Sequence, residues 1–136
     1  MLSTKKLLYK ILQSFTTNKV LWSGVWIGGG NQTKSLSEPI SKQPHGVVLA
    51  FSLYEGGTAK DYDWQYFFVP KWHVINHGGA GIDFFLSTKN QASSKYLYVS
   101  DTSISGATGN GDTNTGSASK IVLTNGGFVL RAVIGV

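Results

Sequence analysis

From residue 20 onward, short apolar segments alternate with turns rich in glycine, asparagine and serine, and this pattern constrains the fold more than any other feature. β-branched and aromatic side chains dominate the segments, as is typical of strands, while glycine and asparagine accept the positive φ angles of tight turns. After residue 20 no segment of convincing length has the 3.6-residue period of a helix, so helices that connect parallel strands are not expected. The pattern predicts strands over residues 20–27, 33–40, 47–54, 62–69, 82–87, 96–100, 120–124 and 128–136.

These strands predict an all-β fold, an antiparallel β-sandwich or jelly roll preceded by a short amphipathic helix. The 136 residues suffice for one core, and 17 glycines against 3 prolines indicate many turns and few rigid linkers. We expect a helix and linker over residues 1–19 and a β-sandwich domain over residues 20–136. Residues 106–119 contain no apolar side chain larger than alanine, so we expect a long exposed loop there. In the strand 128–136, strict alternation would place Phe128, Leu130, Ala132 and Ile134 on one face.

The predicted N-terminal helix, residues 4–15, carries its apolar side chains on one stripe. Leu8, Ile11, Leu12 and Phe15 recur at intervals of three and four residues, with lysines mostly elsewhere. A helix of about twelve residues is marginally stable alone in water, so the stripe requires a partner. We expect these four residues to form an oligomer interface.

Charge and cysteine content exclude several classes of protein. The net charge of +5 comes mostly from scattered lysines, with Arg131 as the one guanidinium, so we do not expect nucleic-acid binding. The absence of cysteine excludes disulfides, thiolate metal sites and a cysteine nucleophile. No apolar run approaches the roughly 20 residues of a membrane span, and the opening segment does not resemble a secretion signal.

Two pairs of side chains have spacings that occur in metal-binding or catalytic sites. His73 and His77 have the spacing of two zinc ligands on a helix, but Val74 stands where a metalloprotease has its glutamate, and glycines follow. In an extended segment the two histidines would lie about 13 Å apart, too far to share one metal. Asp61 and Asp63 are close enough for glycoside hydrolysis, but such pairs usually flank turns in solvent. We therefore predict no metal, cofactor or catalytic residue.

Two further motifs are incomplete. Residues 112–116 resemble the start of a calcium loop but lack its later glutamate, and no nucleophile-elbow motif is present.

Aromatic residues form a more promising pattern. Residues 62–69 place tyrosine, tryptophan and phenylalanine on one face of a predicted strand, and one of its two faces should belong to the core. Trp72 with His73, His77 and Asp83 would combine an apolar platform with hydrogen-bonding groups, which suits a sugar ring. The more common outcome is that such aromatic side chains serve the core and a subunit interface.

Several segments resemble small structural proteins of tailed bacteriophages and prophages, usually described as tail, baseplate or fibre components. The resemblance follows the same order along nearly the whole chain, at residues 4–12, 21–24, 46–51, 62–71, 95–101 and 128–136. This family has no catalytic signature. The resemblance therefore implies a virion protein of the tail, made in the cytoplasm of a bacterial host and bound to other tail proteins.

Together, these observations predict a non-enzymatic phage tail protein that assembles as an oligomer, with a homotrimer expected because fibre-type proteins commonly have threefold symmetry. If the domain recognises a host surface, we expect its ligand to be a saccharide. The alternatives are a free carbohydrate-binding module, which would be monomeric, and a small glycan hydrolase, which would need two convergent carboxylates.

Overall fold

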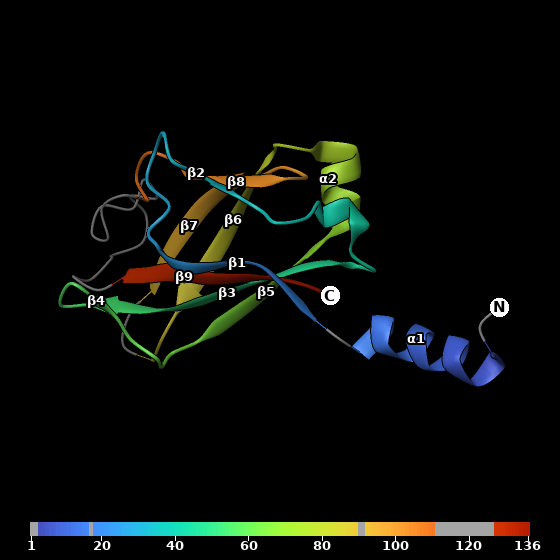
Figure 1. The fold of residues 1–136 in the computed structure, drawn as a ribbon. Coiled ribbons are helices and arrows are strands. Elements are labelled where there is room, and N and C mark those ends of the chain that lie inside the picture. Colours follow the sequence, from blue (N-terminus) through green and yellow to red (C-terminus); the bar gives the residue numbers. More distant parts are fainter. Residues whose placement is uncertain (1–2, 17, 90–91, 111–126) are drawn as a thin grey trace.

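The structure, a computed structural model, describes residues 3–16, 18–89, 92–110 and 127–136, without the side chains of residues 11–16. Two antiparallel sheets make up most of it (Figure 1). In the first sheet β1 (Lys19–Trp26), β9 (Gly127–Gly135) and β3 (Gly46–Glu55) lie in that order, and β3 also pairs with β4 (Thr58–Ala59) and β5 (Gln65–Pro70). The second sheet has the order β2 (Thr33–Ser35), β8 (Ser103–Ser105), β7 (Ala92–Val99) and β6 (Gly81–Ser87). The helices are α1 (Thr4–Thr16), α2 (Lys71–His77) and the short 3₁₀ helix η1 (Ile40–Lys42). The predicted all-β class is confirmed.

One hydrophobic core receives side chains from both sheets. Phe51 on β3 and Phe84 on β6 are almost completely buried, and their ring centroids are 5.6 Å apart. Phe67 on β5 contacts both rings edge-on, at 5.8 and 5.3 Å. Because aromatic rings bury large apolar areas, these three rings stabilise the packing of the first sheet against the second, on the side of the first sheet where β5 lies.

Most of the predicted strands are present, and two of them are shorter than expected. The strand predicted over residues 33–40 ends at Ser35, because Pro39 has no N–H to donate and the fully buried Ile40 begins η1. The strand predicted over 62–69 begins only at Gln65, because Asp63 adopts a left-handed conformation with φ 57°. β4 and β8 are too short for a sequence pattern and were not predicted. The strand predicted over 120–124 lies outside the described residues.

β9 occupies the middle of the first sheet, between β1 and β3. Its predicted alternation is wrong after Leu130, because the register with β3 shifts there and Arg131 becomes an extra residue. Phe128, Leu130 and Val133 therefore enter the core, while Ala132 and Ile134 lie on the opposite face.

α1 confirms the predicted helix and projects away from the body beyond the start of β1 (Figure 1). Leu7, Leu8 and Tyr9 are each about half exposed or more, and Leu8 reaches 56%. Among the other residues of the predicted interface, the side chains of Ile11, Leu12 and Phe15 lie outside the described part. No described helix combines the length and the apolar character that crossing a bilayer requires.

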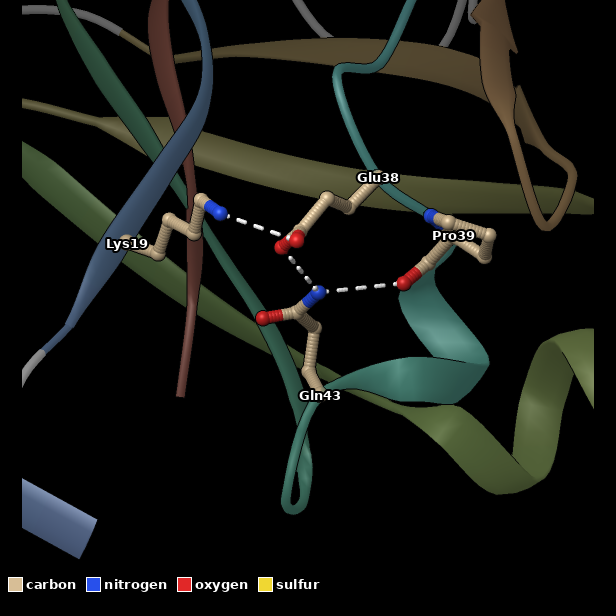
Figure 2. Close-up of polar contacts among 4 residues, drawn as sticks. All are labelled: Lys19, Glu38, Pro39 and Gln43. Carbon is tan, nitrogen blue, oxygen red and sulfur yellow. Dashed lines mark hydrogen bonds and ion pairs between the residues drawn. The ribbon is translucent and has the colours of Figure 1, made fainter. Parts of the chain in front are cut away.

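A polar cluster fixes the start of β1, next to α1 (Figure 2). The Lys19 ammonium lies 2.8 Å from Glu38 Oε1, and the Gln43 amide donates to Glu38 Oε2 at 3.4 Å and to the Pro39 carbonyl at 3.1 Å. The hydrogen bond from Lys19, with help from Gln43, lowers the pKa of Glu38 below its usual value. A Cβ on Gly135 would meet the end of the Gln43 side chain, so a larger residue there would displace the amide from this cluster.

Candidate functional site

α2 is a helix that the sequence analysis did not predict, because the glycines after His77 indicated a turn. Pro70 precedes the helix with an extended conformation, and Gly78 and Gly79 follow it, Gly79 with φ 85°. Seven residues between a proline and two glycines are enough for two turns, and the buried Val74 anchors them to the core. The helix connects the end of β5, in the first sheet, to the start of β6, in the second.

The helical conformation corrects the expected distance between the two histidines. His73 and His77 share one helix face with ring centroids 6.5 Å apart, in place of the 13 Å of an extended chain. The His73 Nε2 atom lies 3.2 Å from the Ala80 carbonyl oxygen, which orients that ring. Within the described residues, no group of three metal-ligating side chains comes together.

A cleft of about 360 Å³ lies between β5, α2 and β6. Its walls are mostly apolar, with two polar side chains, and consist of Phe67, Phe68, Val69, Pro70, Trp72, His73, Ile82, Asp83 and Phe84. Three of the four predicted ligand-binding residues, Trp72, His73 and Asp83, therefore line one cleft although Asp83 comes from a different element. His77 does not line it but packs edge-on against Trp72, with ring centroids 5.1 Å apart.

The cleft combines an exposed aromatic ring with polar side chains. Trp72 is 60% exposed and offers an indole to an apolar ring face. His73 and Asp83 add hydrogen-bonding groups beside it. Apolar walls with a few polar groups are usual for ligand sites, and aromatic side chains can stack against the apolar face of a sugar.

A second aromatic surface, which the sequence analysis missed, covers the outer face of β6 and β7. Phe85, Tyr96 and Tyr98 are exposed there, and Asp83 lies directly opposite Tyr96. The two tyrosine rings meet edge-on at 5.2 Å, and the Tyr96 ring lies across Gly81, where a Cβ would collide with it. The alternation of residues 81–87 and 95–99 contained the signal for this surface, because it places these rings opposite the core. Asp83 thus connects the cleft with the tyrosine surface.

The predicted carboxylate pair does not form part of a strand. Asp61 Oδ1 accepts a hydrogen bond from Arg131 at 3.0 Å, and the same guanidinium donates to Ser52 Oγ and to the Lys60 carbonyl. Arg131 also lies 5.0 Å from the centroid of the Trp64 ring. The ion pair with Arg131 is therefore sufficient to explain the aspartate at position 61 as a structural residue.

Comparison with protein-family models finds no match for this chain, and comparison with curated protein sequences finds none either.

Proposed function

We propose that the protein is a non-enzymatic structural subunit of a phage tail, in the tail tip, baseplate or fibre, which assembles with further copies through α1. The observation that carries the proposal is the projecting helix, on which Leu7 and Leu8 are about half exposed. A short amphipathic helix of this kind is stable only when its apolar face is covered. The resemblance to phage tail proteins supplies the biological setting.

The proposal includes a β-sandwich arrangement of the body, with the two sheets packed face to face. The shared core, in which Phe51 and Phe67 of the first sheet meet Phe84 of the second, supports it. A body of this type would act as a rigid unit whose loops and cleft remain accessible.

Light scattering on the full chain tests the assembly. We expect the mass of a trimer, about 44 kDa for three chains of 14.7 kDa. Leu8→Lys should dissociate it, because it places a charge in the apolar stripe. Gln13→Lys adds the same charge on the other side of the predicted helix and serves as the matched control, with no change in mass. A monomeric parent chain at high micromolar concentration would contradict the proposal.

As a second function we propose saccharide binding at the cleft, which the convergence of Trp72, His73 and Asp83 favours. A free carbohydrate-binding module would have the same cleft but remain monomeric, so the mass measurement separates these alternatives.

Binding to purified cell-wall polysaccharide of the host tests the second function. Trp72→Ala should weaken binding at least about tenfold, because it removes the stacking surface. Ile75→Ala is the matched control, since Ile75 is equally exposed on α2 but does not line the cleft. Circular dichroism establishes that both variants fold. Equal binding by the two variants, or none by the parent chain, would exclude this function.

A further inference from the structure

The outer face of the first sheet, opposite the core, carries a continuous apolar band. The strand register aligns Val20 with Ile134, Ile134 with Val48, and Val48 with Phe68, so one row crosses β1, β9, β3 and β5. Residues directly opposite each other in antiparallel strands have their side chains on the same face. Val20 and Phe68, at the two ends of the row, are each 55% exposed, and Phe68 also borders the cleft.

A second row extends the band toward the other end of the sheet. Ala132 pairs with Ala50, and Ala50 pairs with Tyr66, whose ring is exposed. The Tyr66 ring runs parallel to that of Trp64, with centroids 6.3 Å apart. We name these two rows, together with Trp64, the outer apolar face. Ala50 in the middle of the second row is only 2% exposed, whereas the Tyr66 ring at its end is 63% exposed. Exposed apolar side chains gathered on one face often mark an interaction site.

We infer that the outer apolar face is the docking site for α1 of a second copy of the chain, an inference that rests on the proposed assembly through α1. The length of α1 is sufficient to cross the sheet. Thirteen residues of helix extend about 20 Å at 1.5 Å per residue, and four strands spaced about 4.8 Å apart are about 14 Å wide from first to last. One helix therefore covers a whole row.

One carboxylate near Trp64 can match part of the positive charge of α1. α1 carries Lys5, Lys6 and Lys10 and no acidic residue. Two exposed carboxylates border the outer apolar face beside Trp64: Asp61, which is paired with Arg131, and Asp63. Because Arg131 already pairs with Asp61 and lies over the Trp64 ring, Asp63 is the carboxylate that the flanking lysines of α1 would approach.

The position of α1 identifies another copy as the source of the helix. α1 continues outward from the start of β1 and points away from the sheet of its own chain (Figure 1), and Leu7 and Leu8 are about half exposed. A helix that docks on the next copy makes a head-to-tail contact, in which two different surfaces meet. Such contacts close into rings when the rotation between copies allows it, and a trimer is the smallest such ring beyond a dimer.

Disulfide trapping tests the inference, because the chain has no cysteine and every introduced thiol is unique. Leu8→Cys is mixed with a mass-tagged Tyr66→Cys variant under mild oxidation, and the parent chain's mass is measured in parallel. We expect a mixed disulfide-linked dimer. Tyr98→Cys is the matched control, because Tyr98 is an exposed tyrosine on the outer face of the second sheet, and its yield of mixed dimer should be at least about tenfold lower.

A second pair of variants avoids dependence on cross-linking. Tyr66→Glu should weaken self-association at least about tenfold, while Tyr98→Glu should leave it unchanged. A parent chain that is oligomeric but links Leu8→Cys only to itself, with Tyr66→Glu still assembled, would overturn the inference and leave the proposed assembly intact. A disulfide within a single monomeric Leu8→Cys/Tyr66→Cys chain would show that the helix covers its own sheet and would overturn both.

Discussion

Among the described residues, Lys95 is the side chain whose surroundings oppose its charge most strongly. It points inward from β7 and is 3% exposed, and its ammonium donates to the Asn110 carbonyl at 3.3 Å. Burial lowers the pKa of Lys95 to about 8 from 10.5. An unfolded chain would keep this proton up to about pH 10.5, so between pH 8 and 10.5 the unfolded state binds more protons and the free energy of unfolding rises with pH.

Lys95→Met should therefore stabilise the protein at pH 7, because methionine fills a similar volume without the desolvation cost of the ammonium. The lowered pKa corresponds to at most about 3 kcal/mol, and loss of the hydrogen bond to Asn110 reduces that gain. Urea denaturation at pH 7 and pH 10 measures it, and the advantage should shrink at the higher pH. The exposed Lys89 gives the control, Lys89→Met. Equal destabilisation by Lys95→Met at both pH values would contradict this account.

Residue types and spacing were sufficient to predict most of the candidate site. Trp72 and His73 are neighbours in the chain, and Asp83 lies in the adjacent predicted strand, so short connections brought them together. His77 was misplaced relative to the cleft because its helix was not predicted. Phe68 and Ile82 could not be assigned to the cleft from the sequence, since that assignment requires knowing that β5 and β6 lie on either side of α2.

Among the elements, those with long regular patterns were predicted well. α1, β3 and β6 agree closely with their predicted ranges, because each has a uniform period and a clear boundary. α2 was missed because seven residues are too few to establish a helical period, and tertiary contacts of Val74 stabilise it. The shift at Arg131 could not be predicted because it depends on how β3 and β9 pair.

β9 should be an element that the fold cannot lose without a large cost in stability, because it pairs along both edges. Removing residues 132–136 takes away the fully buried Val133 and the backbone pairing between Val136 and Gly46. We expect a loss of at least about 4 kcal/mol in the free energy of unfolding. Removal of residues 1–5 is the control of equal length and, with both truncations made in the monomeric Leu8→Lys chain, should leave the thermal midpoint unchanged. An unchanged midpoint for the first truncation would show that β9 is dispensable.

At the scale of the whole molecule, α1 should contribute little to the stability of the body, the part of the chain formed by the two sheets. α1 projects from the body, and the polar cluster at Lys19 holds β1 without using the helix (Figures 1 and 2). Removing residues 1–18 should therefore shift the unfolding midpoint of the monomeric body by no more than about 2 °C. Calorimetry at a dilution where Leu8→Lys is monomeric provides the reference. A large drop in the midpoint would show that the helix packs on its own body.

The central place of β9 also determines the order in which the first sheet can form. β1 and β3 are joined in that sheet only through β9, although β9 is translated after every other described strand. While the chain is being synthesised, β1 and β3 thus each present an unpaired edge, and these pairings span most of the sequence. Contacts between such distant segments form slowly and leave nascent chains prone to association with the wrong partner. A cell that makes many copies at once would therefore have to shield these edges until β9 emerges.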